Sequence, residues 1–188
     1  MSKVTSRRRS TYTAAARPAW RRGYSRSFSR RSVVRTAAFF GPWDNANFVT
    51  RTLADAADGR EIVAADDAVI SPTYVVDLVH AALDLLIDGE SGVWHLANRG
   101  AITWAALARL AIRYAGMDTS LVAGRPTHTL GLRARRPRYS VLGSERGALM
   151  PPLEDALQRY FLDRNGRQVR ERVRERRRAP REIGVAVQ

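Results

Sequence analysis

The positive charge of this chain of 188 residues lies in its two ends, and this limits the part that can form a core. Residues 1–31 carry ten Lys or Arg and no acid, and residues 164–188 carry nine Arg and three Glu. Residues 32–163 carry thirteen Arg against fifteen Asp or Glu. Because dense like charge opposes compaction, we expect one folded portion at 32–163 between two disordered basic extensions. The sequence RQVRERVRERRR after Asp163 is compatible with a helix, but such a helix would bury little.

The extension 1–31 is rich in Arg and Ser and shows no apolar periodicity. It lacks the apolar middle region of a secretory signal, and we expect a cytoplasmic protein. Its composition also fits an organelle-targeting peptide. Basic residues alternate with aromatic ones, a pattern that suits single-stranded nucleic acid through phosphate contacts and base stacking. We favour a disordered extension or a displaced translation start over nucleic-acid binding.

The apolar residues of 32–163 follow both strand and helix spacing, which predicts an α/β fold. Strands are expected at 32–37, 61–65, 68–71 and 93–97. Helices are expected from Asn45 or Asn47 to Asp58, from Thr73 to Gly89, from Thr103 to Gly116, and from Pro151 onward. In the second helix the face with Val75, Val79, Ala82 and Leu86 is expected to be buried. Residues 117–146 are expected to be irregular.

Residue content excludes several kinds of site. The chain has no Cys, which excludes a disulfide scaffold, a Cys-ligated zinc site and a thiol nucleophile. It has no run of about 18 apolar residues, so we expect no membrane-spanning helix. It has neither a GxGxxG turn nor a P-loop, and its only lysine is Lys3.

No catalytic residue and no metal ligand is assigned from the residues alone. His80, His95 and His128 lack metal-ligand spacing, and we expect structural roles for them. Asp66 and Asp67 are adjacent, as in a turn, where Asp bonds its own backbone.

Three motifs in 32–163 occur in the order found in one enzyme family. They are RTAAFFGPWDNANFV, ISPTYVVDLVHAALDLLIDGESGVWHLAN and RPRYSVLGSERG. With them the segment resembles the C-terminal half of the dTDP-4-dehydrorhamnose reductases, which are extended short-chain dehydrogenase/reductases acting on nucleotide sugars. The resemblance implies the substrate-binding half of an extended Rossmann-type fold, with an incomplete parallel sheet and covering helices. It also implies a dTDP-sugar ligand in deoxysugar or rhamnose biosynthesis.

The resemblance implies binding residues around the loop 38–47, which walls the sugar and diphosphate site in the family. Phe40 and Trp43 are expected to contact the ligand, with a core position as the alternative. Asn47 and Phe48 would open a helix that faces the diphosphate. This placement suits an anion, because helix N-termini present free N–H groups.

Two later motifs add further expected binding residues. Pro72 and Thr73 would begin a helix at the substrate cleft, or serve only as a helix start. Arg136, Pro137 and Ser140 belong to the segment that covers the nucleotide in the family. The Arg136 guanidinium suits bidentate phosphate binding, with a solvated basic loop as the alternative. Next to them stands Tyr139, where many relatives have Asn.

The chain lacks the Gly-rich turn and the Tyr-x-x-x-Lys pair of the complete family enzyme, which uses NADPH or NADH. Reduction of a keto sugar needs a hydride donor at the carbonyl and a Tyr acid whose pKa the Lys lowers. We therefore hypothesise a truncated nucleotide-sugar-binding portion that binds no cofactor by itself and is inactive alone. The alternatives are a nucleic-acid-binding protein acting through its Arg-rich ends, and a subunit completed in trans by a Rossmann cofactor domain.

The resemblance also has a consequence for folding. In the complete enzyme the strands at Val33 and Val93 pair with a parallel sheet that the other half largely builds. Alone they would present unpaired edges and exposed apolar side chains. We therefore expect 32–163 to fold poorly by itself, to form a homo-oligomer, or to dock on a separate cofactor domain.

Overall fold

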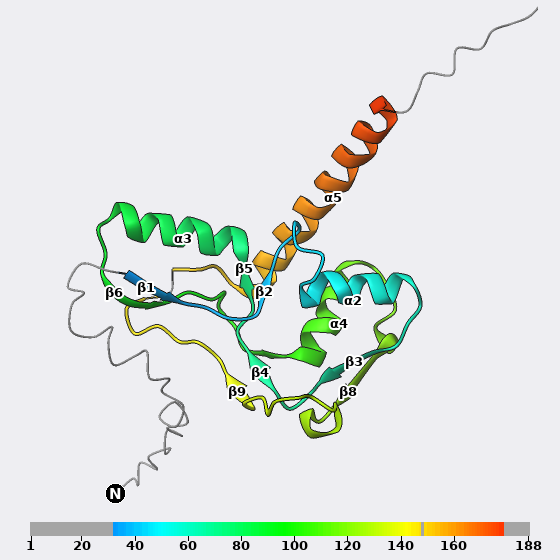
Figure 1. Cartoon of the computed structure of the whole chain (residues 1–188), viewed down its shortest axis with the longest axis horizontal. Helices are drawn as coiled ribbons and strands as arrows, with labels where there is room; N and C mark the ends of the chain where they lie inside the picture. Colours follow the sequence, from blue (N-terminus) through cyan, green and yellow to red (C-terminus); the bar gives the residue numbers. More distant parts are fainter. Residues whose placement is uncertain (1–31, 148, 179–188) are drawn as a thin grey trace, which may run out of the picture.

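Short strand pairs separated by helices make up the structure, a computed structural model that describes residues 32–147 and 149–178 (Figure 1). The strands are β1 Ser32–Arg35, β2 Phe39–Phe40, β3 Ile62–Ala65, β4 Val69–Ile70, β5 Thr73–Tyr74, β6 Gly92–His95, β7 Ile102–Thr103, β8 Val122–Arg125 and β9 Tyr139–Ser140. The helices are α2 Phe48–Ala57, α3 Val75–Ile87, α4 Trp104–Tyr114 and α5 Leu153–Arg178, with 3-10 turns η1 Thr119–Leu121 and η2 Thr127–Thr129. The interpretations of 1–31, nucleic-acid binding included, lie outside the described residues.

The strand pairs are mostly parallel. β1 pairs with β6, with Val33 opposite Val93, and β3 pairs with β8, with Ile62 opposite Val122. β2 pairs with β5 in parallel, and β4 lies between antiparallel β7 and parallel β9. The predicted α/β class with an incomplete parallel sheet is confirmed.

Local capping explains where two of the helices begin and end. The Asn47 side chain accepts a hydrogen bond from Thr50 N at 3.0 Å and caps α2, while Thr103 Oγ1 accepts one from Ala106 N at 3.2 Å and caps α4. After these helices Gly59 and Gly116 adopt φ angles of 68° and 69°, the left-handed conformation that ends a helix. The sequence predicted both boundaries.

Helix α3 begins differently from the prediction. Thr73 lies in β5, and Tyr74 holds the cap position without a side-chain cap bond. The backbone N–H of Tyr74 donates a hydrogen bond to Asn98 Oδ1 at 2.7 Å. The expectation that this helix begins at Thr73 is therefore wrong, because Thr73 belongs to β5 and a side chain distant in sequence satisfies the helix end.

The buried face of α3 also differs from the prediction. Its buried residues are Asp77, Ala81 and Leu85, whereas Val79 and Leu86, which were expected inside, are 48% and 72% exposed. Because apolar residues occur on every side of this helix, their spacing does not select one face. The face that carries Asp77 is buried because Asp77 has charged and polar partners there.

The C-terminal part departs from the expected boundaries. Strand β8 lies within 117–146, a region that was expected to be irregular. Its sequence, VAGR, has one large apolar residue and gives little strand signal. Helix α5 continues to Arg178, so the disordered extension expected from residue 164 is instead helical in backbone up to that point. No helix among the described residues combines the length and the apolar character that crossing a membrane requires.

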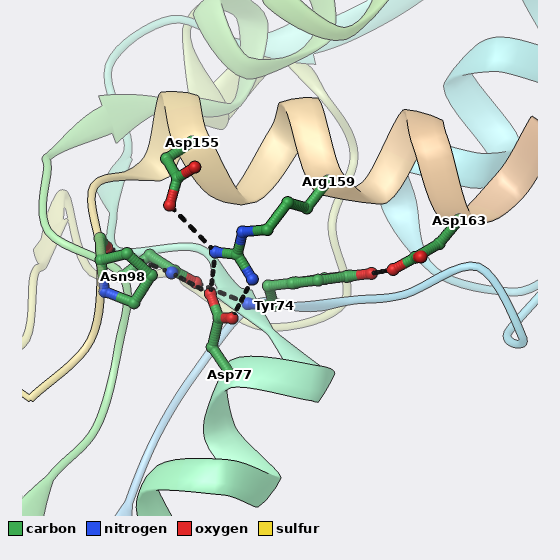
Figure 2. A network of polar contacts seen from close by, with 7 residues as sticks. Tyr74, Asp77, Asn98, Asp155, Arg159 and Asp163 are labelled. Atoms are coloured by element: carbon green, nitrogen blue, oxygen red, sulfur yellow. Dashed lines mark hydrogen bonds and ion pairs between the residues drawn. The ribbon is translucent and has the colours of Figure 1, made fainter.

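A polar network joins α3, α5 and the loop after β6 (Figure 2). The Arg159 guanidinium contacts both carboxylate oxygens of Asp77, at 2.8 Å for the Nη2–Oδ2 pair, and Asp77 is 7% exposed. Asn98 Nδ2 donates to Asp77 Oδ2 at 2.8 Å. The Tyr74 hydroxyl donates to Asp163, and burial together with this acceptor raises the pKa of Tyr74.

The network lies beside the main apolar core. Phe40, Tyr74 and Tyr160 are at most 1% exposed, with ring centroids 5.3 Å apart for Phe40–Tyr74 and 5.8 Å for Phe40–Tyr160. Around them lie Val49 and Leu53 of α2, together with Leu107 of α4 and Leu157 of α5. Helix α5 therefore begins at the centre of the molecule and runs outward (Figure 1).

We expect the Asp77→Ala substitution to lower the free energy of unfolding by about 3 kcal/mol, because it leaves Arg159 and Asn98 without their shared acceptor. Asp155→Ala removes another contact of Arg159, at 3.3 Å, but Asp155 is half exposed. This matched control should cost less than about 1 kcal/mol. Urea unfolding followed by circular dichroism measures both, and equal losses would contradict a structural role for the buried pair.

Candidate functional site

One cavity of the described structure has a volume of about 1010 Å³. It lies between α2, β3 and the segment 130–140 that ends in β9. Phe48 and Arg51 line it from α2, and Trp104 lines it from the start of α4. Its size suits a ligand of several rings.

An aromatic pair forms one wall of this cavity. The Phe48 and Trp104 rings meet edge to face, with centroids 4.8 Å apart, and both side chains are only partly buried. The adjoining N-terminus of α2 has N–H groups that a helix leaves unbonded. This wall offers apolar ring surface beside weakly positive backbone groups, which suits a ring attached to an anion.

A second cavity of about 350 Å³ adjoins the first, and Leu132 and Arg136 line both. Its other lining residues with ionisable side chains are Asp67, His128, Arg135 and Arg138. The surface here is therefore mainly positive and concave.

Asp67 organises one side of the small cavity. Its carboxylate accepts hydrogen bonds from the Thr127 hydroxyl and from Thr127 N, the latter at 2.8 Å. These bonds hold the pKa of Asp67 below its ordinary value, with the Thr127 hydroxyl as the largest cause. The bonds tie the β3–β4 turn to η2.

The large cavity brings together part of the expected site. Phe48, Arg136, Pro137 and Ser140 all line it, although they come from distant parts of the chain. Ser140 lies in β9, which pairs with β4 and so brings the Arg136 segment to the cavity.

The other expected residues line neither cavity. Phe40 is in the apolar core at 1% exposure, which matches its alternative core reading. Asn47 caps α2, and its amide donates to Gly41 O at 3.0 Å. These hydrogen bonds of its side chain join it to other groups of the protein. Pro72 and Thr73 are buried, while Trp43 is 61% exposed in its loop.

Sequence reasoning missed Arg51 and Trp104 as lining residues. Arg51 lies three residues after Phe48 on α2, so helical spacing from the motif residue would have placed it on the same side. Trp104 directly follows the helix cap Thr103, and only the folded chain brings it to Phe48.

The described residues do not fit a dinucleotide. Such a site needs glycines in the turn from a strand to a helix, so that the backbone can approach the pyrophosphate. Here α3 directly follows β5 and α4 directly follows β7 without glycine, and the β2–α2 loop contains a single glycine, Gly41, rather than the repeated glycines of such a turn. Gly59, Gly89 and Gly116 have positive φ angles, but each follows the end of a helix. We therefore assign no hydride-transfer step to these residues.

No group of metal-ligating side chains occurs within residues 32–147 and 149–178. Of the histidines, His95 lies beside the backbone: its Nδ1 is 2.8 Å from Gly143 O, and its Nε2 is 3.4 Å from Arg35 Nη1.

Comparisons with known proteins identify relatives of this arrangement. A family model described as the RmlD substrate binding domain matches residues 24–160. The dTDP-4-dehydrorhamnose reductase of Streptomyces griseus is 37% identical over 121 residues, which cover 61% of this chain and 39% of that protein. The reductase of the same name from Mycolicibacterium smegmatis is 40% identical over 128 residues, covering 65% and 38%.

A solved structure of a protein with the same name is also similar to this chain. The dTDP-4-dehydrorhamnose reductase of Bacillus anthracis, in complex with NADP, is 32% identical with a TM-score of 0.66, over 70% of this chain and 48% of that one. The chain thus spans between 38% and 48% of the length of these relatives. The resemblance read from the three motifs is confirmed.

We expect Thr127→Ala to raise the pKa of Asp67 toward its ordinary value, because the hydroxyl donor is lost, while Thr127→Ser keeps the lowered value. The folded-state pKa of Asp67 lies below its unfolded value. Its stabilising contribution is thus present above the unfolded pKa and is lost as pH falls through the folded one. NMR titration of the carboxyl carbon measures this, and an identical pKa in the Ala and Ser variants would contradict the role of the hydroxyl.

Proposed function

Because this chain belongs to the RmlD substrate binding domain family, we propose that it binds a dTDP-linked 4-keto-6-deoxyhexose in deoxysugar biosynthesis. One observation carries the proposal: four residues expected from the family motifs lie around one large cavity. The names of relatives agree with this ligand, among them the dTDP-4-keto-6-deoxy-D-glucose reductase of Streptomyces niveus, which is 36% identical over 115 residues. We keep the cytoplasm as the proposed location.

The cavity supplies two kinds of contact that such a ligand needs. The Phe48 and Trp104 rings offer apolar surface to the base or the deoxysugar. Arg136 offers paired donors to the diphosphate, and guanidinium groups bind phosphate oxygens bidentately. Of the expected residues outside the cavity, Trp43 is exposed and free to contact the sugar end, whereas Asn47 would act by holding the start of α2.

We propose further that reduction of this sugar needs a separate cofactor-binding α/β unit, in the same or another polypeptide. NADPH bound there would supply the hydride, because the described residues do not form a site that fits this dinucleotide. Strand β1 pairs only with β6, so its other edge has no partner strand among the described residues. Parallel sheets are normally covered on both faces, yet Val33 and Val93 are 38% and 44% exposed.

The direction of the β1 hydrogen bonds identifies the residue at the open edge. Arg35 O accepts a hydrogen bond from Leu96 N, so Arg35 faces β6. Because successive residues of a strand point their N–H groups to opposite sides, Val34 N–H faces the open edge. A parallel strand of the cofactor unit would receive this donor.

For the ligand, titration calorimetry with dTDP should show binding to the full chain. Arg136→Gln should weaken it by about 10- to 100-fold, because one charge-assisted hydrogen bond contributes about 1.5–3 kcal/mol. Arg133→Gln is the matched control, since Arg133 lies in the same loop and lines neither cavity. The absence of dTDP binding to a folded chain would contradict the proposed function.

For the cofactor unit, the chain is mixed with the part of the Mycolicibacterium smegmatis relative that it does not match. We expect a complex that oxidises NADPH in the presence of dTDP-4-keto-6-deoxyglucose. Val34→Pro should weaken the complex at least about tenfold, because it removes the edge donor, while Val34→Thr keeps it. A homo-oligomer that excludes this partner, or equal binding by both variants, would contradict docking at β1.

A further inference from the structure

Helix α3 exposes a row of large apolar side chains that line neither cavity. Val79, Leu83, Leu86 and Ile87 are 48%, 49%, 72% and 80% exposed, and these four residues are called the α3 stripe below. Two of them, Val79 and Leu86, belong to the face that the sequence predicts to be buried. We propose that the α3 stripe packs against the same stripe of a second copy of this chain, with the two helices antiparallel. This inference goes beyond the proposed function, because the contact needs neither ligand nor cofactor.

The side of α3 that carries the stripe has no acidic residue. At about 100° per residue, Asp77, Asp84 and Asp88 lie within about 40° of one another, and the stripe lies on the opposite side of the helix. The other helices differ, since Arg51 is exposed on α2 and Arg113 on α4. A helix face that stays in water normally carries polar residues, whereas an exposed apolar row is typical of an interface.

The cofactor unit proposed above would not cover the α3 stripe. Ala81 and Leu85 of α3 pack with Trp94 of β6, and Leu83 lies about 200° around the helix from Ala81. A unit that adds a strand at β1 extends the same sheet, and the helices that cover one face of a sheet lie side by side in one layer. Such a helix would reach the flank of α3 and leave its outer side open. Figure 1 shows α3 at the rim of the molecule, beyond β1 and β6.

The spacing of the α3 stripe suits a two-fold arrangement. Val79, Leu83 and Ile87 follow one another at intervals of four residues, so Leu83 is their midpoint. In an antiparallel pair centred there, Leu83 faces Leu83 of the second copy, and Val79 faces Ile87 of the second copy. A two-fold dimer needs one self-complementary surface, which this spacing provides.

The polar groups beside the α3 stripe are complementary in the same arrangement. His80 and Asp84 lie on one flank of the stripe, and both are exposed. In an antiparallel pair the same flanks of the two helices meet, so His80 lies beside Asp84 of the second copy, displaced by about 3 Å along the helix axis. A parallel pair would instead place Asp84 beside Asp84. The imidazole of His80 can donate to the carboxylate or carry the opposite charge, and symmetry forms this contact twice.

Sedimentation equilibrium of the full chain should show a dimer of twice the chain mass of 21.0 kDa. We expect a dissociation constant of about 1–100 μM, because each copy contributes one helix to the interface. Leu83→Glu places two carboxylates opposite each other at the two-fold axis and should raise this constant at least about 30-fold. Leu162→Glu is the matched control: Leu162 is 71% exposed on α5, and this change should stay within about threefold. Circular dichroism checks that both variants are folded.

A mixing experiment tests the antiparallel direction. His80→Glu places two acidic groups beside each other across the interface, and Asp84→Arg places two basic ones there, so each variant alone should dimerise at least about fivefold more weakly. Mixed in equal amounts, the two variants should form a heterodimer with about the affinity of the unaltered chain. In that heterodimer each acid meets a base of the other copy, although the neighbours within each helix are unchanged.

A chain that stays monomeric up to about 200 μM, or a dimer that Leu83→Glu does not weaken, would overturn this inference. No gain in association on mixing would overturn the antiparallel pairing. If Leu83→Glu weakens the complex with the cofactor unit instead of a dimer, the α3 stripe belongs to that unit and the inference is wrong. Binding of dTDP is measured separately on the same proteins, so the proposed function stands or fails independently of these results.

Discussion

The arrangement of this protein depends on one buried ion pair between two helices that are far apart in sequence. Asp77 enters the interior on α3 and is matched there by Arg159 of α5, with Asn98 bonded to the same carboxylate. Asn98 also accepts the backbone N–H that begins α3. A buried carboxylate without these partners would be strongly unfavourable, so these contacts favour the register in which the three segments meet.

That register determines how the side of the molecule with α3 and the side with α2 and α4 lie relative to each other. On one side α3 lies with β6, and on the other lie α2 and α4 (Figure 1). Trp94 of β6 and Leu96 after it pack with Ala81 and Leu85 of α3, whereas Phe48 of α2 and Trp104 of α4 form the aromatic wall of the large cavity. The first side ends in strands whose apolar faces are partly open, as expected from the family resemblance. The second side is the more complete one, with the large cavity beside it. The chain therefore combines a formed cavity with strands whose apolar faces are partly exposed.

The candidate site shows which lining residues the family motifs could identify and which they could not. Phe48, Arg136, Pro137 and Ser140 were named from the sequence and share the cavity. Phe40 came from the same motif, yet it fills the core beside Tyr74, because a motif marks a segment and does not say which side of it faces inward. The positions of Arg135 and Arg138 in the lining of the small cavity had no signal apart from general basicity, since they depend on the pairing of β9 with β4, which brings their segment to the Asp67 turn.

The sequence by itself determined the α/β class and the caps at Asn47 and Thr103, because a cap acts on backbone groups only a few residues away. It also determined the family, because the three motifs and their order can be recognised without knowledge of the fold. The tertiary structure alone decided which face of α3 is buried, since that helix is apolar on several sides and only Arg159 and Asn98 distinguish the face of Asp77. It alone decided that β8 is a strand, because β3 supplies the hydrogen bonds that the short sequence VAGR does not predict.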